Sequence, residues 1–212
     1  MNSRRSSKRK ISRNKSRSKK PLAIGLVAVI LIVIVGVAAF YVFGMNNSTP
    51  TGNKVLLKTS MGDITIQLRD DRPITTSNFK NLVQKGIYDG TIFHRVIYDF
   101  IVQGGDPTGT GYGDPSIPNI QDEINGDNHN SRGTVAMANT GQPNTASSQF
   151  FINLKNNSEI EYDDGSTFDQ KYTVFGTVIS GMNVVDEIAN VATDADGRPI
   201  IPVVLNHAEI IS

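Results

Sequence analysis

One stretch of the sequence places polar side chains suited to binding or catalysis inside an otherwise apolar run. In FHRVIYDFIVQGGD, residues 93–106, His94 and Arg95 stand side by side among hydrophobic residues, and Gln103 precedes two glycines. Burial of an unpaired guanidinium is costly, so Arg95 must either face a carboxylate or line a cleft. Asp99 or Asp89 would make it a structural ion pair, and this interpretation stays open at this point.

The residue types present exclude several kinds of catalysis. The chain has no cysteine, which excludes disulfides and thiol chemistry. Its three histidines, His94, His129 and His207, lack the spacing of metal ligands. We therefore expect no metal and no cofactor, and we interpret His94 as a structural or hydrogen-bonding residue.

Two long segments rich in Gly, Pro, Asp and Asn adjoin apolar stretches that carry an amide side chain. Residues 104–130 begin directly after Gln103, and residues 139–148 end directly before Gln149. Loops of this length in a compact domain are either functional or disordered. Their pairing with the two glutamines favours a binding groove.

The N-terminal part differs in composition from the rest of the chain. Residues 1–21 hold ten Lys or Arg and no acidic residue, and Leu22–Phe43 carries no charge. As a helix, the second segment would span ~33 Å, enough to cross the hydrocarbon core of a bilayer. We predict a basic tail at 1–21, a transmembrane anchor at 22–43 and a linker at 44–53. In the competing interpretation, a cleaved secretory signal, Val37–Ala39 would be the cleavage site.

The charge distribution predicts both topology and the class of partner. The positive-inside rule keeps the basic tail in the cytoplasm and places residues 54–212 outside it, in a single-pass membrane protein. Outside the tail the chain has 11 Lys and Arg against 20 Asp and Glu. We therefore expect no binding of nucleic acid.

Residues 54–212 are numerous enough for one well-buried domain, and their pattern is mainly that of β-strands. Helices are expected at 75–86, where Thr75 or Thr76 would cap the N-terminus, and at 181–190. Alternating apolar and polar residues predict strands at 55–58, 63–68, 91–96, 134–137, 149–153, 173–178 and 203–211.

Several blocks of this region resemble the signature sequences of the cyclophilins. They are FHRVIYDFIVQGGD, MANTGQPNTASSQFFI at 137–152 and YTVFGTVISGMNVVDEI at 172–188. The opening block GDITIQLRDDRPITTSNFKNLVQKGIYDGTIFHRVI is also similar, so the resemblance covers essentially all of 54–212. It implies a peptidyl-prolyl cis-trans isomerase of mainly β class. The implied fold is a closed eight-stranded antiparallel barrel capped by two α-helices, here preceded by a single transmembrane helix.

The resemblance also implies an active-site surface. The residues expected to act in catalysis are Arg95, Phe100 and Gln103. Those expected to bind substrate are Phe93, His94, Ile101, Ala138, Asn139, Gln149, Phe151, Phe168 and Tyr172.

Two positions depart from the pattern of many eukaryotic cyclophilins. Thr167 stands where they have Trp, and Tyr172 stands where they have His. The Trp is associated with tight binding of cyclosporin, so cyclosporin binding by this chain is doubtful. The Arg, Phe and Gln residues are intact.

Rotation about an Xaa-Pro bond needs no nucleophile, metal or redox group, because no covalent bond is broken. The sequence therefore predicts an isomerase in which Arg95 stabilises the transition state within an apolar groove. Its expected partners are proline-containing peptides and unfolded or folding extracytoplasmic proteins. The alternative is a chaperone-like module that binds Pro-containing segments without catalysis.

Overall fold

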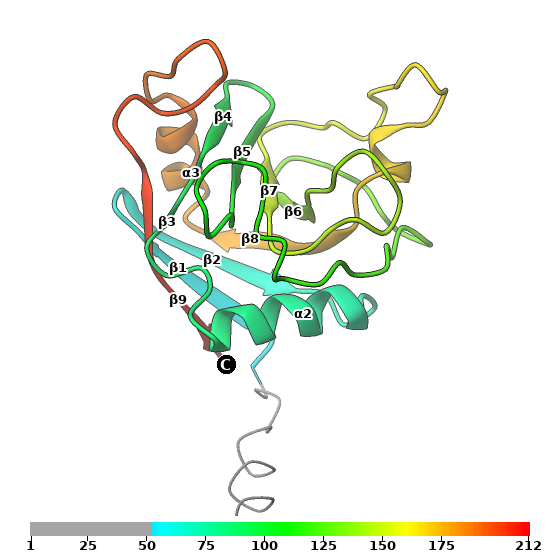
Figure 1. Ribbon diagram of the computed structural model, residues 1–212, viewed down its shortest axis with the longest axis horizontal. Coiled ribbons are helices and arrows are strands. Elements are labelled where there is room, and N and C mark those ends of the chain that lie inside the picture. Colours follow the sequence, from blue (N-terminus) through cyan, green and yellow to red (C-terminus); the bar gives the residue numbers. More distant parts are fainter. Residues whose placement is uncertain (1–51) are drawn as a thin grey trace, which may run out of the picture. The chain divides into compact units, whose positions relative to one another are not determined.

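Nine antiparallel strands form one strongly curled sheet in the computed structural model, which describes residues 52–212 (Figure 1). The order across the sheet is β3-β9-β1-β2-β8-β6-β7-β5-β4. The strands are β1 (Lys54–Thr59), β2 (Gly62–Leu68), β3 (Thr91–Ile92), β4 (Arg95–Ile97), β5 (Ile101–Gly104), β6 (Thr134–Met137), β7 (Phe150–Asn153), β8 (Val174–Ser180) and β9 (Val204–Ile211). The helices are α2 (Pro73–Gln84), α3 (Met182–Ala189) and the short 3-10 helix η1 (Phe168–Gln170).

The predicted eight-stranded closed barrel differs from this sheet in two respects. The expected strand at 91–96 is interrupted at Phe93 and His94, which separates β3 from β4. A further strand, β5, lies where no strand was predicted. The strands β3 and β4 are the two ends of the order, and within residues 52–212 no ladder pairs them. Closure into a barrel is therefore not confirmed.

The core lies inside the curl of the sheet. Val96, Val102, Ile152 and Val135 are direct cross-strand neighbours on β4, β5, β7 and β6, and all four are buried. We call them the inner row. Helix α2 packs against β9, and α3 packs against β2, β4 and β5. Figure 1 shows the two helices well separated from each other, so each contributes its apolar face to a different part of the core.

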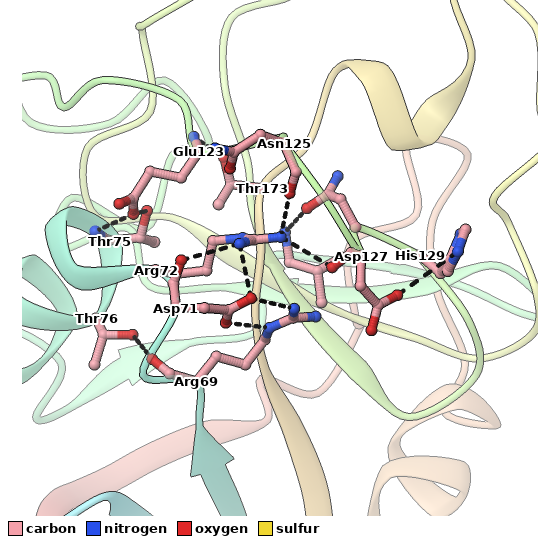
Figure 2. Close-up of polar contacts among 12 residues, drawn as sticks. Arg69, Asp71, Arg72, Thr75, Thr76, Glu123, Asn125, Asp127, His129 and Thr173 are labelled. Atoms are coloured by element: carbon pink, nitrogen blue, oxygen red, sulfur yellow. Dashed lines mark hydrogen bonds and ion pairs between the residues drawn. The ribbon is translucent and has the colours of Figure 1, made fainter.

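A residue from a distant loop holds the N-terminus of α2. The threonine caps predicted for this helix are wrong, because the helix begins at Pro73 and has no side-chain cap in the preceding residue. Instead, the Glu123 carboxylate accepts a hydrogen bond from the Ile74 N–H group at 3.2 Å. It also accepts from the N–H group (2.8 Å) and the hydroxyl (2.7 Å) of Thr75, as Figure 2 shows. A carboxylate at this end is also favoured by the helix dipole.

Arg72 anchors the same loop from the other side. Its buried guanidinium donates to the carbonyl oxygens of Asn125 (2.7 Å) and Asp127 (2.9 Å) and pairs with Asp71 at 2.9 Å (Figure 2). Asp71 also accepts two hydrogen bonds from Arg69, and these chiefly lower the pKa of Asp71 to about 2. The far end of the long segment 104–130 is therefore tied to the body of the domain.

The predicted membrane topology needs correction. No helix within residues 52–212 is long and apolar enough to span a bilayer. The localisation as a single-pass membrane protein with an extracytoplasmic domain is therefore withdrawn. The basic tail at 1–21, the anchor assigned to Leu22–Phe43 and most of the linker at 44–53 lie outside the described residues. The predicted domain at 54–212 begins where β1 begins, and the division of the chain stays a prediction.

Candidate active site

One row of cross-strand neighbours lies along the outer face of the sheet. Arg95 on β4 pairs with Gln103 on β5, Gln103 pairs with Phe151 on β7, and Phe151 pairs with Ala136 on β6. Each of these residues is next in sequence to a member of the inner row. Because side chains alternate between the two faces of a sheet, this row points away from the core. The sheet thus aligns a cation, an amide and an aromatic ring.

A second apolar cluster, separate from the main core, covers this outer face. Phe168 of η1 makes edge contacts with Phe100 and Phe151, with ring centroids 5.7 and 5.6 Å apart. Tyr172 makes an edge contact with Phe151 at 5.3 Å. The buried members are Ile101, Ala136, Phe151, Phe168 and Val174, with Phe100, Ala138, Tyr162 and Tyr172 packed against them. These side chains form an apolar wall beside Arg95.

Two adjoining hollows open at this place. The first, which we call the aromatic pocket, has a volume of about 430 Å³. It is lined by Arg95, Phe100, Ile101, Gln103, Ala138, Asn139, Phe151, Tyr162, Phe168 and Tyr172. The second hollow, of about 290 Å³, shares Gln103, Ala138 and Asn139 with the first and also contains Gln149 and Gly111. The three shared residues make the two hollows parts of one groove.

Arg95 has no counter-ion in the described part of the chain. Asp99 pairs with Lys155 at 3.0 Å, and Asp89 pairs with His207 at 2.8 Å, so the two carboxylates considered from the sequence have other partners. The Arg95 guanidinium donates one hydrogen bond, from Nη1 to Oε1 of Gln103, at 3.3 Å. Its remaining N–H groups can therefore contact a ligand in the aromatic pocket.

A chain of amides determines how Gln103 is turned. Gln103 Nε2 donates to Oε1 of Gln149 at 2.9 Å, and Gln149 Nε2 donates to the Gly111 carbonyl oxygen at 3.0 Å. A carbonyl oxygen can only accept, so Gln149 must direct its NH2 group to Gly111 and its oxygen to Gln103. Gln103 must then direct its own oxygen to Arg95. The Gly111 carbonyl oxygen thus determines the direction of every hydrogen bond from Gln149 through Gln103 to Arg95.

Asp106 holds the loop that carries Gly111. Its buried carboxylate accepts from the N–H groups of Thr108 (2.9 Å), Gly111 (2.6 Å) and Gly113 (3.2 Å). Burial by itself would raise the pKa of Asp106, but these hydrogen bonds outweigh it and lower the pKa below its usual value. Gly111 has φ = +89°, a conformation that favours glycine.

The structure brings nine of the twelve predicted site residues to the aromatic pocket and places Gln149 in the second hollow. Phe93 and His94 line neither hollow. Phe93 is in the main core, where its ring and that of Phe150 make an edge contact with their centroids 6.4 Å apart. His94 is buried, burial lowers its pKa, and both ring nitrogens lack hydrogen-bond partners among the described residues.

One residue of the pocket, Tyr162, was not predicted from the sequence. It lies on the loop between β7 and η1, outside the blocks that carry the family resemblance. No periodic pattern marks such a loop, and only the three-dimensional path of the chain brings Tyr162 beside Tyr172. Within residues 52–212 no group of three His, Asp or Glu side chains is placed to hold a metal ion.

This domain is similar to known proteins. Residues 54–210 match the family model described as cyclophilin type peptidyl-prolyl cis-trans isomerase/CLD. A peptidyl-prolyl cis-trans isomerase of Schizosaccharomyces pombe is 48% identical over 152 residues, which cover 70% of this chain and 92% of that protein. One from Arabidopsis thaliana is 42% identical over 171 residues, covering 78% of this chain and 99% of that protein.

Solved structures show the same similarity. A cyclophilin type peptidyl-prolyl cis-trans isomerase of Cryptosporidium parvum matches with a TM-score of 0.66 and 32% identity, covering 76% of this chain and 98% of that chain. Its structure in the presence of the dipeptide Ala-Pro matches with the same TM-score and 33% identity, covering 75% and 99% of the two chains. With the family model matched from the first residue of β1 to within β9, the chain belongs to the cyclophilin-type peptidyl-prolyl cis-trans isomerases.

Proposed function

We propose that Arg95 catalyses rotation about Xaa-Pro bonds by donating a hydrogen bond to the proline nitrogen in the twisted transition state. Rotation of a planar amide is opposed by resonance, with a barrier of ~18–20 kcal/mol. When the bond is twisted, the resonance is lost and the nitrogen lone pair can accept a hydrogen bond. A donor that acts on this state more than on either planar state lowers the barrier.

The proposal is supported above all by the Arg95 guanidinium, which lines an apolar pocket and has no counter-ion in the described part of the chain. Arginine stays charged at any physiological pH and presents several donors in one plane. Its interaction with a ligand is strengthened where apolar side chains exclude water. The Gln103 amide, fixed in polarity by Gln149 and Gly111, keeps the guanidinium oriented before the peptide binds.

The apolar wall supplies the second requirement, a binding surface for the proline ring. Phe100, Phe151 and Phe168 offer ring faces and edges and no polar atom that would have to lose water. Asn139 lines both hollows, and its side chain is held by a hydrogen bond to the Lys171 carbonyl oxygen at 2.7 Å. The backbone groups of Asn139 can therefore bind the peptide backbone beside the proline while Arg95 acts on the bond.

Proteins in the course of folding are the proposed natural substrates. Uncatalysed Xaa-Pro isomerisation takes tens to hundreds of seconds at about 25 °C, which is slow enough to limit folding. A groove built from apolar rings, an arginine and backbone groups recognises a proline in an extended segment. Such segments are accessible chiefly before a protein has folded.

The test is the cis-to-trans relaxation of an Xaa-Pro tetrapeptide in the presence of the full-length protein. Arg95→Ala should reduce kcat/KM by about 10²–10³-fold, the range found when one preorganised donor is removed from an active site. Arg95→Lys, which keeps the charge without the planar fork, should recover part of that loss. The matched control is Arg132→Ala, because Arg132 pairs with Asp186 at 2.8 Å and does not line the pocket. Near-normal rates for Arg95→Ala would refute the proposal.

A further inference from the structure

The loop between β7 and η1 brings a tyrosine to the wall of the aromatic pocket. Phe168 N–H donates to the Ile160 carbonyl oxygen (2.8 Å), and Tyr162 N–H donates to the Ser166 carbonyl oxygen (2.9 Å). These hydrogen bonds join the two ends of a short loop formed by residues 160–168. Tyr162 and Phe168 are the two residues of this loop that line the pocket. The place of the Tyr162 ring is therefore set by hydrogen bonds within the loop itself.

Neighbouring side chains hold this ring in one orientation. It is nearly parallel to Phe168, with centroids 6.3 Å apart and an interplanar angle of 13°. Lys171 Nζ lies 4.7 Å from the centroid of the Tyr162 ring, a cation–π distance, and also pairs with Asp164 of the same loop at 2.8 Å. The phenol is thus fixed between η1 and a cation rather than free at the surface.

The hydroxyl of Tyr162 is directed at a second tyrosine of the pocket. It donates a hydrogen bond to the Tyr172 hydroxyl at 3.1 Å. Burial chiefly, and this hydrogen bond in addition, raise the pKa of Tyr162 above its usual value. Tyr162 therefore stays neutral over the physiological pH range and retains its proton for the contact with Tyr172.

This arrangement leaves one proton without an acceptor. A hydroxyl that accepts a hydrogen bond can still donate its own proton. Within residues 52–212 the Tyr172 hydroxyl donates to no protein group, and Tyr172 is one of the residues that line the pocket. The other aromatic rings of that wall are phenylalanines, so the two tyrosine hydroxyls are the polar groups among its aromatic side chains. An extended peptide supplies the matching group, since each residue carries a backbone carbonyl oxygen.

We propose that Tyr162 and Tyr172 form a paired-hydroxyl donor for a backbone carbonyl oxygen of a residue that flanks the Xaa-Pro unit. Tyr172 gives the proton, and Tyr162 is a positioning residue that orients the Tyr172 hydroxyl and keeps this side of the pocket closed. The proposal rests on the aromatic pocket being the site that takes the proline. It gives the hydroxyl of Tyr172 a specific role and adds Tyr162, which lies outside the residues implied by the family resemblance, as a determinant of peptide selection.

The test uses the full-length protein with Tyr162→Phe, Tyr172→Phe and the double variant. Each single change removes a hydroxyl and keeps the ring. The matched control is Tyr98→Phe, because Tyr98 is 71% exposed and lines neither hollow of the groove. The substrates are an Xaa-Pro tetrapeptide, a peptide that ends at proline as a dimethylamide, and a peptide that lacks the residues before Xaa.

For the tetrapeptide, each hydroxyl deletion should reduce kcat/KM roughly two- to tenfold, the equivalent of one net hydrogen bond. The loss should be mostly in KM, because the carbonyl is bound equally in the planar and twisted states. The loss should persist for the truncated peptide that keeps this flanking carbonyl and disappear for the truncated peptide that lacks it. The double variant should lose little more than a single one, because the two hydroxyls act as a unit.

Equal losses on all three peptides, or losses no larger than that of the control, would overturn the proposal and leave the pair a purely structural contact. Arg95→Ala, measured in parallel, separates this result from the proposed mechanism. If that variant kept wild-type turnover while the peptide-dependent tyrosine effect remained, the arginine mechanism would fail and the tyrosine proposal would stand.

Discussion

Gln103→Glu replaces one NH2 group with an oxygen and so tests whether the amide chain orients Arg95. A carboxylate at this position can still accept from Arg95, but it cannot donate to Gln149. If the Gln149 amide keeps its orientation, two acceptor oxygens face each other across the 2.9 Å contact. If that amide turns over, its oxygen instead faces the Gly111 carbonyl oxygen across the 3.0 Å contact. One repulsive pair remains in either case.

The size of the effect follows from the contact with Arg95. At 3.3 Å, an ion pair gains ~5 kcal/mol of Coulomb energy at an effective dielectric constant of ~20. Desolvation and screening reduce the net gain over a neutral hydrogen bond to ~1–1.5 kcal/mol. This stronger attraction between the new carboxylate and the Arg95 guanidinium is already present in the ground state, and it opposes the contact of the guanidinium with the proline nitrogen. A loss of ~1.4 kcal/mol in the transition state reduces the rate about tenfold.

Protonation should reverse the effect, which makes the pH profile the informative assay. A neutral carboxyl group can donate to Gln149 and accept from Arg95, as the native amide does. The variant should be about tenfold less active than wild type near pH 8 and should approach it as the pH falls through the pKa of the new carboxyl, ~4.3 before perturbation. Gln121→Glu, at an exposed position, is the control. A variant-to-wild-type ratio that does not change with pH would refute the reasoning.

The remaining predictions concern stability. Glu123→Ala removes the acceptor for two N–H groups at the start of α2 and should lower the free energy of unfolding by ~1–2 kcal/mol in urea titrations, with Glu123→Gln intermediate. Equal stability of Glu123→Ala and wild type would contradict this. Asp106 has a lowered pKa in the folded state, so its contribution is complete above its unfolded value of ~3.9 and is lost as the pH falls through the folded value. Asp106→Asn should therefore destabilise the protein at neutral pH and weaken the dependence of its stability on acid pH. If the stability of Asp106→Asn fell with acid pH as steeply as that of the wild type, carboxylates other than Asp106 would control the acid dependence.

Much of the fold could be predicted because periodicity is visible in the sequence. The two helices and the strands β1, β2, β6, β7, β8 and β9 lie within a few residues of their expected bounds. Strand β5 was missed for a physical reason. Its four residues are buried at three positions and do not alternate, and it ends at glycine. The cap of α2 could not be predicted either, because Glu123 reaches it from a loop 48 residues further along the chain.

Most residues of the site could be named from the sequence, but where each side chain points in the structure could not always be predicted. In a continuous strand Phe93 and Arg95 would share a face, since they are two residues apart. The interruption at Phe93 and His94 instead turns Phe93 into the core while Arg95 lines the pocket. Neither this break nor the approach of Tyr162 to Tyr172 has a signal in the local sequence, because both depend on contacts between distant segments.

The central claim is that Arg95 acts on the twisted bond and contributes little to binding of the planar peptide. Exchange spectroscopy on an Xaa-Pro peptide bound to the full-length protein measures the rate of interconversion on the protein, and titration measures its Kd. For Arg95→Ala the account predicts a Kd within about threefold of wild type and an interconversion rate about 10²–10³-fold lower. A bound peptide that interconverts at the wild-type rate in this variant would contradict it, whatever happens to the affinity.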